Sequence, residues 1–207
     1  ARSSAGSSGG TRGGTPVRLD LVLANWTLFA EGVWITVQLT VLALGFGFLI
    51  ALPAGLARAA RVPGAERLLG AYVYLFRGTP LLVQIVWFYY ALPIVLQVDL
   101  PDWFAAGLGL TLYMGAFATE IFRGGIISID KGQWQASRAL GMTGGELMRH
   151  IILPQATKRM VPPFVNQSII QLKNTSLLYV VAIPDLMYTG SIVVSDTVWI
   201  SRGKPAV

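Results

Sequence analysis

The chain has 207 residues, of which 54% are hydrophobic and only 13% charged, and its mean hydropathy is +0.59. Soluble domains carry roughly a quarter charged residues, so this composition indicates a protein whose solvent is the lipid bilayer. The net charge of +6 does not indicate nucleic-acid binding, because basic residues alternate with long uncharged stretches. With no cysteine and a single histidine, His150, disulfides are excluded and no metal site is expected.

A polar segment precedes the hydrophobic part of the chain. Residues 1–20 are rich in Gly, Ser, Thr and Arg, which predicts a flexible tail, and they lack the early apolar stretch of a cleaved signal peptide. We therefore divide the chain into a flexible or external N-terminal segment (1–30), a transmembrane domain (31–200) and a short C-terminal tail (201–207).

Four stretches are apolar enough to cross a bilayer, which takes roughly 20 residues of helix. They cover about residues 33–57, a part of 68–98, about 103–121 and about 160–184. The second stretch is interrupted at 77–80, where Thr79 is predicted to cap a new helix with Pro80 in its first position. The stretch after residue 184 is broken by Ser195 and Asp196, and it is too short and polar to be predicted as a further span.

The basic residues orient these spans. The connection between the first two spans carries Arg58, Arg61 and Arg67, and residues 123–159 between the last two carry six Lys or Arg residues. The connection between the second and third spans has none. Because basic connections stay on the cytoplasmic side, we expect both basic connections to be cytoplasmic and the N-terminus to be external.

The second basic connection, residues 130–154, has the pattern of a helical hairpin. Asp130 followed by Gln133 predicts a helix start at which Asp caps the backbone and Gln reaches back. Gly141 suits a helix end in the left-handed conformation, and Thr143 with Glu146 predicts a second capping box. Small residues on the first helix would let the surface of another protein approach closely. The alternative is that the two helices merely pack beneath the bundle.

The hairpin resembles the EAA loop of ABC importer permeases. The resemblance rests on residues 133–141, QWQASRALG, and on residues 152–156, ILPQA. In that family the loop supplies a coupling helix that sits in a groove of a separate ATPase subunit. The chain has Gln135 where the family usually has Glu, and Ser137 where it usually has a second Ala. The resemblance implies these ATPase-coupling residues: Gln135, Ala136, Ser137, Ala139, Leu140 and Gly141.

Other segments resemble the polar amino-acid permeases of this family, the histidine, glutamine, arginine and glutamate type. They are residues 76–84 (FRGTPLLVQ) and 172–177 (LKNTSL), and together with residues 120–126 (EIFRGGI) the resemblance covers about residues 32–190. It implies an all-α fold, a polytopic transmembrane helix bundle of the type I ABC importer permease kind. The family core has five spans, and we expect the last to be incomplete here, through truncation or through divergence of the final segment.

The same resemblance implies an assembly in the cell (inner) membrane. Its other parts are a cytoplasmic ABC ATPase dimer, a second permease subunit of the same or a different kind, an external substrate-binding protein and an amino-acid substrate. The sequence contains no Gly-x-x-x-x-Gly-Lys-Ser/Thr phosphate-binding loop. We therefore expect a transporter subunit, not an enzyme, that binds no cofactor, while ATP and Mg are used by the partner ATPase.

Polar residues within the predicted spans are candidates for the substrate path. Ionisable groups at membrane depth are costly and usually face a cavity or a partner, which singles out Glu120 and Lys173. Either the two pair with one another, or Glu120 attracts a substrate ammonium and Lys173 a carboxylate. Asn174, Thr175 and Ser176 form a polar interruption of the fourth span, which would either bind a zwitterion or only satisfy a kink. Arg77 and Gln84 lie at the break in the second span, where Arg77 would either line the path or anchor the helix at the membrane interface.

ATP-driven amino-acid import is thus the predicted function. The alternatives are a permease for a different small solute in the same superfamily, an energy-independent carrier or channel, and a membrane subunit that does not conduct. The hairpin argues against the energy-independent carrier, which has no use for a surface that couples to an ATPase. The segments at 76–84 and 172–177 are the only ones that favour amino acids over other solutes.

Overall fold

The computed structural model describes residue 23 and residues 25–201, and all regular elements there are helical, as predicted. Residues 1–22 of the predicted N-terminal segment and residues 202–207 of the predicted tail lie outside the described residues. Three short segments of other helix types lie between α-helices: π-helical Trp87–Ala91 and Leu147–Ile152, and 3-10 helical Thr175–Val181. These α-helices are α2 (Trp26–Ala59), α3 (Ala65–Gly78), α4 (Leu81–Val86), α5 (Leu92–Leu96), α6 (Asp102–Ile127), α7 (Lys131–Ala139), α8 (Gly144–Glu146), α9 (Leu153–Asn174) and α10 (Leu186–Ser201).

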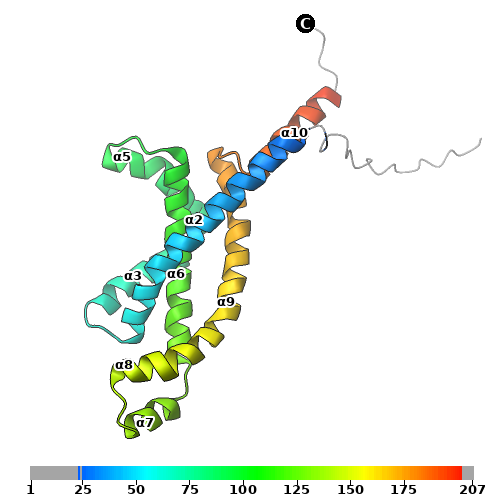
Figure 1. The fold of residues 1–207 in the computed structure, drawn as a ribbon. Coiled ribbons are helices and arrows are strands. Elements are labelled where there is room, and N and C mark those ends of the chain that lie inside the picture. The colour runs from blue at the N-terminus through cyan, green and yellow to red at the C-terminus, as the bar shows by residue number, and fades with distance from the viewer. Residues whose placement is uncertain (1–22, 24, 202–207) are drawn as a thin grey trace, which may run out of the picture.

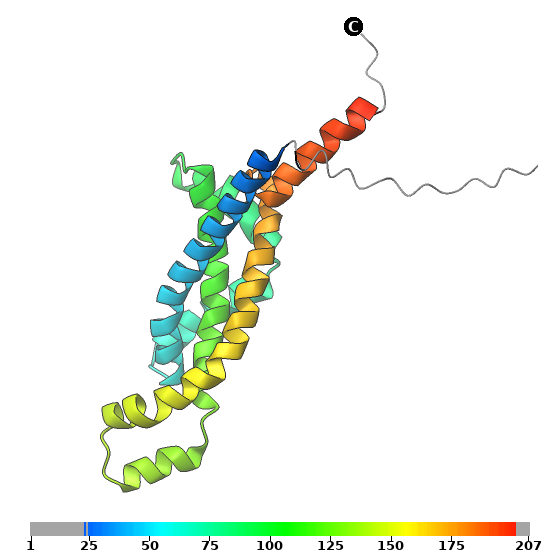
Figure 2. The ribbon, with the colours of Figure 1, turned by 45° about the vertical axis from the view of Figure 1, so that its right-hand side comes forward.

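Three long helices, α2, α6 and α9, lie side by side along the length of the molecule (Figure 1, Figure 2). The α7–α8 hairpin projects beyond one end of this bundle, and α10 leaves it at the opposite end. Helix α6 is central, because it packs against α2, α3, α4 and α9.

The described helices provide up to four membrane crossings, as many as the sequence predicts. Helices α2 and α6 are each long and apolar enough to span a bilayer alone. Two more crossings result if each bent pair is one span: Ala65–Gly78 with Leu81–Leu96, bent by 106°, and Gly144–Val181 with Leu186–Ser195, bent by 51°.

The contact between α2 and α6 is close because α2 presents glycines to its neighbour. A Cβ atom at Gly47 would lie 2.9 Å from Cγ of Met114, and one at Gly55 would lie 2.5 Å from Cβ of Phe122. Neither distance is compatible with a side chain in this packing. In a bilayer, where lipid tails are as apolar as the helices, such small residues permit the close packing that drives association.

The predicted break in the second apolar stretch is confirmed, but the predicted cap is wrong. Pro80, in extended conformation, precedes the first residue of α4, and it is not itself in the helix. Thr79 is also extended, as expected of a residue before proline. Its Oγ1 donates to the carbonyl of Leu75 at 2.8 Å, so the side chain turns back onto α3 and does not cap α4.

Each π-helical turn comes just before a proline. The amide of Leu153 donates to the carbonyl of Met148, five residues back, and Pro154 follows. The other such turn, Trp87–Ala91, likewise precedes Pro93. Proline has no amide hydrogen and its ring clashes with the carbonyl four residues back, and at both places the helix passes the proline through one widened turn without ending.

The predicted break at Ser195 and Asp196 is wrong, because α10 continues without interruption to Ser201. The hydroxyl of Ser195 donates to the carbonyl of Ile192 at 2.8 Å, so its hydrogen-bonding need is met inside the helix. With 16 residues, α10 is about 24 Å long, shorter than a hydrocarbon core of about 30 Å.

We expect Gly55→Ala to lower the free energy of unfolding by about 1–3 kcal/mol, because the added methyl group would displace Phe122. Unfolding in detergent, followed by circular dichroism, measures the change. Gly45→Ala is the matched control on the same helix, since a Cβ there meets nothing within 4 Å. Equal losses at both positions would contradict the close α2–α6 contact.

Candidate functional site

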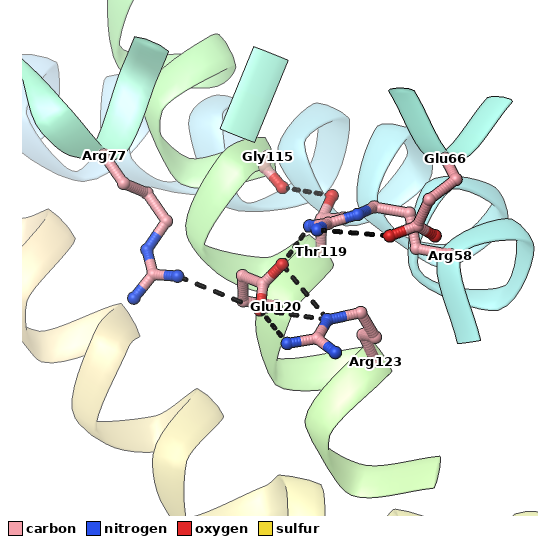
Figure 3. A network of polar contacts seen from close by, with 7 residues as sticks. All are labelled: Arg58, Glu66, Arg77, Gly115, Thr119, Glu120 and Arg123. Carbon is pink, nitrogen blue, oxygen red and sulfur yellow. Dashed lines mark hydrogen bonds and ion pairs between the residues drawn. The ribbon is translucent and has the colours of Figure 1, made fainter. Parts of the chain in front are cut away.

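Glu120 lies at the centre of an ion-pair cluster where α2, α3 and α6 meet (Figure 3). From the next turn of α6, Arg123 donates to Oε2 of Glu120 through Nη2 at 2.8 Å and through Nε at 3.1 Å. Arg58, at the end of α2, donates to Oε1. Arg77, at the end of α3, places Nη1 3.9 Å from Oε2. One carboxylate therefore joins three helices.

Burial makes these ion pairs necessary. The side chains of Glu120 and Arg58 are 17% and 12% exposed, and an unpaired charge at such a position costs several kcal/mol. Arg58 also lies 3.9 Å from Oε1 of the half-exposed Glu66, near the start of α3. Three arginines and two glutamates give the cluster a formal charge of +1, so its carboxylates are fully matched by cations.

Arg77 is the most loosely held member of the cluster. Its side chain is 43% exposed, more than that of Arg58 or Arg123. Its guanidinium carbon lies 5.0 Å from the centroid of the Phe117 ring, within the range of a cation–π interaction. Arg77 therefore faces α6 and does more than anchor its helix at the membrane surface.

Gln84 closes the bend beside Arg77. Its Nε2 donates to the carbonyl of Phe76 at 2.8 Å and to the carbonyl of Thr79 at 3.1 Å, which are acceptors left free where α3 ends. Gln84 is only 7% exposed. The geometry gives Gln84 a role in fixing the end of α3.

Glu120 and Lys173 do not pair. Lys173 is exposed on α9, and within the described residues it makes no ion pair. The neighbouring Gln171 donates to the carbonyl of Leu110 on α6 at 3.3 Å. Glu120 is ten residues further along α6, about 15 Å away at 1.5 Å per residue. The cluster already supplies Glu120 with cations at shorter range.

The polar interruption after Lys173 coincides with a change of helix type. Helix α9 ends at Asn174, which is half-buried, and the 3-10 turn begins at Thr175, which is fully buried and donates to the carbonyl of Leu172 at 2.7 Å. Ser176 is exposed and lines a groove of about 760 Å³ between α2, the 3-10 turn and α10. The predicted path residues thus separate into two groups, Glu120 with Arg77 and Lys173 with its successors.

The predicted start of the first hairpin helix is confirmed in one of its two contacts. Oδ1 of Asp130 accepts a hydrogen bond from the amide of Gly132 at 2.6 Å, so the predicted cap is confirmed. Gln133 does not reach back to it. Its Oε1 accepts a hydrogen bond from Nε2 of Gln155 at 3.3 Å, which ties α7 to α9. Gly141 has φ of +79°, the predicted left-handed conformation.

The predicted capping box at the second helix of the hairpin is confirmed. Oγ1 of Thr143 accepts from the amide of Glu146 at 3.3 Å, and the amide of Thr143 donates to Oε2 of Glu146 at 2.9 Å. These two hydrogen bonds give partners to the amides of Thr143 and Glu146, which have no acceptor within the first turn of the helix.

The hairpin exposes most of the residues that the family resemblance selects. Leu140 is 82% exposed, a high value for an apolar side chain. Ser137 is the exception, since it is 4% exposed and donates to the carbonyl of Gln133 at 2.8 Å. Of the predicted docking residues, those on the outer surface are Gln135, Ala136, Ala139, Leu140 and Gly141.

The chain belongs to the family described as binding-protein-dependent transport system inner membrane components, whose pattern matches residues 43–197. It is therefore a multi-pass membrane component of a transporter, and the family's permease subunits are not themselves catalytic.

Relatives and solved structures agree with this assignment. The chain is 37% identical over 174 residues to the L-cystine transport system permease protein of Bacillus subtilis, covering 84% of this chain and 74% of that protein. It is 37% identical over 171 residues to the glutamine transport system permease protein of Escherichia coli, covering 81% and 77%.

Its fold matches a crystal structure of an amino acid ABC transporter with histidines, with a TM-score of 0.81 and 32% identity, over 88% of this chain and 85% of that one. An inward-facing methionine ABC transporter matches with a TM-score of 0.69 and 26% identity, over 81% and 80%. The type I importer permease bundle expected from the sequence is confirmed.

Sequence reasoning did not place Arg58 and Arg123 in the site. Arg123 could have been found, because a base three residues after an acid shares its face of a helix. Arg58 is separated from Glu120 by 62 residues, and nothing local in the sequence pairs them.

We expect Glu120→Gln to lower the free energy of unfolding by about 1–3 kcal/mol, since three arginines would be left around a neutral amide. Thermal unfolding in detergent at low and high salt measures the loss. Glu31→Gln makes the same chemical change at an exposed position of α2 and should have little effect. An unchanged stability of the Glu120 variant would show that the cluster does not hold the helices together.

The capping box predicts a pH-dependent hairpin. Hydrogen bonds from the backbone and the hydroxyl of Thr143 lower the pKa of Glu146. Because the folded-state pKa lies below the unfolded one, this stabilisation is present at neutral pH and is lost as the pH falls through the lowered pKa. Hydrogen exchange of residues 143–152, corrected for intrinsic rates, should accelerate below about pH 4. Glu146→Gln should abolish that pH dependence. Persistence of the same dependence in the variant would assign it to another group.

Proposed function

We propose that this chain is the permease subunit of an ATP-driven amino-acid importer and that its α7–α8 hairpin docks a separate ATPase. The observation that carries the proposal is the hairpin, which projects beyond the bundle (Figure 1) and presents exposed small and apolar residues at its tip. A hairpin that only packed beneath the bundle would bury Leu140, whereas this side chain is 82% exposed. Small residues such as Ala136 and Ala139 leave room for the close approach of a partner.

The amino-acid substrate class is supported by the relatives. The two permease proteins described above are named for cystine and glutamine, and the solved structures are of an amino acid transporter and a methionine transporter. Similarity extends over most of each chain, so the spans that would line the path are included in it.

Lys173 is the candidate for contact with the substrate carboxylate. It is exposed on α9, is not paired with another described side chain, and precedes the turn at which the helix changes type. Exposing a charged side chain of a span to lipid costs free energy. The face of α9 that carries the unpaired ammonium of Lys173 therefore suits a water-filled path or a subunit interface. Ser176 lines the groove close by.

Glu120 fits the substrate ammonium less well than the sequence suggests. Three arginines lie within 4 Å of its carboxylate, and their charge offsets its attraction for a further cation. Its position at the junction of α2, α3 and α6 suits ion pairs that hold these three helices together in one conformation of the transporter and break in another.

The mechanism that follows is alternating access. Closure of an ATPase dimer upon ATP would draw together the hairpins of this chain and of a second permease subunit, identical or different, and would swing the spans to face outward. An external binding protein would then deliver the amino acid, and hydrolysis would restore the inward-facing state. In this arrangement both basic connections lie in the cytoplasm, the N-terminus lies outside, and ATP with Mg binds to the partner ATPase.

Ala136→Asp should weaken association with the ATPase at least about tenfold, because docking would bury an unpaired carboxylate. Co-purification of the ATPase, and its hydrolysis in the presence of binding protein and amino acid, measure the effect. Ala60→Asp is the matched control, since Ala60 is exposed at the end of α2 and lies off the hairpin. Survival of both association and stimulated hydrolysis in Ala136→Asp would refute docking through the hairpin.

The hydrolysis measurement, together with substrate uptake by vesicles, separates the alternatives. A permease for another solute would keep the ATPase bound, but no amino acid would stimulate hydrolysis through the binding protein. A non-conducting subunit would also bind the ATPase, and vesicles containing the complete assembly would take up no substrate.

A further inference from the structure

The second half of the hairpin and the fourth span form one continuous helical segment, which bends between α8 and α9 (Figure 1) and is called the rod below. Helix runs without a break from Gly144 to Val181, through α8, the π-helical turn, α9 and the 3-10 turn. Any displacement of the hairpin tip therefore acts directly on α9, which reaches the opposite end of the bundle (Figure 2).

The joint between hairpin and span is packed, so it does not act as a free hinge. Leu147 and Ile152, which begin and end the π-helical turn, are 3% and 0% exposed. They belong to the same apolar cluster as Phe122 and Ile126 of α6. Close packing of this kind transmits strain, because the interior has few voids to absorb it.

One polar contact ties this rod to the end of α6. The guanidinium of Arg159 donates to the carbonyl of Ser128, the residue that caps the C-terminal end of α6. A cation at this place satisfies a terminal carbonyl and interacts favourably with the negative end of the helix dipole. The next residue, Met160, packs directly over Gly125, where a Cβ would come within 2.3 Å of Cγ of Met160.

We propose that Arg159 is a positioning residue for transport, which couples movement of the hairpin to α6. The inference rests on the proposed function, because it assumes that an ATPase moves the hairpin. With the tie in place, the rod and α6 move together, and the movement reaches Glu120, eight residues before Ser128 on the same helix. Without it, α9 keeps its apolar packing on α6 and the hydrogen bond from Gln171 to the Leu110 carbonyl, but it loses the polar contact at the end of α6 that is nearest the hairpin.

The chain offers a matched control in Lys158. This residue precedes Arg159 on the same helix, is likewise exposed to solvent, and carries the same charge. Within the described residues its side chain makes no hydrogen bond or ion pair. A loss of basic charge near the cytoplasmic surface would affect both positions equally, whereas loss of the tie would affect Arg159 alone.

The test uses the complete assembly in vesicles and measures two quantities, uptake of labelled amino acid and ATP hydrolysis. For Arg159→Gln we expect uptake per ATP hydrolysed to fall by about threefold to tenfold, the size of effect usual for residues that carry coupling. Arg159→Lys should restore part of the ratio, because an ammonium can also donate to the Ser128 carbonyl. Lys158→Gln should leave the ratio unchanged.

Two outcomes would overturn the inference while the proposed function stands. One is an equal ratio in Arg159→Gln and Lys158→Gln. The other is a parallel fall of uptake and hydrolysis in Arg159→Gln, together with a lower unfolding temperature, which would make the contact merely structural. An absence of ATP-dependent uptake by the unsubstituted assembly would instead overturn the proposed function, and the inference with it.

Discussion

The close approach of α2 and α6 is the constraint on which the rest of the structure depends. Gly55 lies against Phe122, and the next turn of α2 carries Arg58 to the carboxylate of Glu120. A larger residue at the contact would separate the helices and part Arg58 from Glu120, so that the largely buried guanidinium would keep only the more distant Glu66, which is destabilising. The glycines therefore do two things, since they let apolar surfaces meet and they permit an acid to be held at the junction of three helices.

Helix α6 links this junction to the hairpin. Its last turn is held by Arg159 and Met160 of α9, and the apolar cluster at its end includes Leu147 and Ile152 of the hairpin joint. Within the described residues, a movement of the hairpin can thus reach the spans through the continuous helix that contains α9 and through the central helix α6. This arrangement suits a subunit that must convert a movement on one side of a membrane into a change in the packing of its spans.

Local features were predictable from the sequence, and distant ones were not. The capping box at Thr143 and the left-handed Gly141 follow from chemistry within a few residues, and they are confirmed. The pairing of Arg58 with Glu120 depends on how two helices approach, which no local pattern reveals. The break predicted at Ser195 was wrong, because a polar residue does not end a helix when its hydroxyl donates a hydrogen bond to a carbonyl of the same helix. The candidate site was therefore predicted as single residues, of whose partners Arg123 could be inferred from its spacing and Arg58 only from the packing.

Uptake of labelled amino acids by vesicles that contain this chain, its second permease subunit, the ATPase and the binding protein tests the central claim most directly. We expect accumulation of at least one amino acid above the external concentration when ATP is supplied on the hairpin side, and none when ATP is withheld. A complete assembly that hydrolyses ATP but accumulates no amino acid under any of these conditions would contradict it.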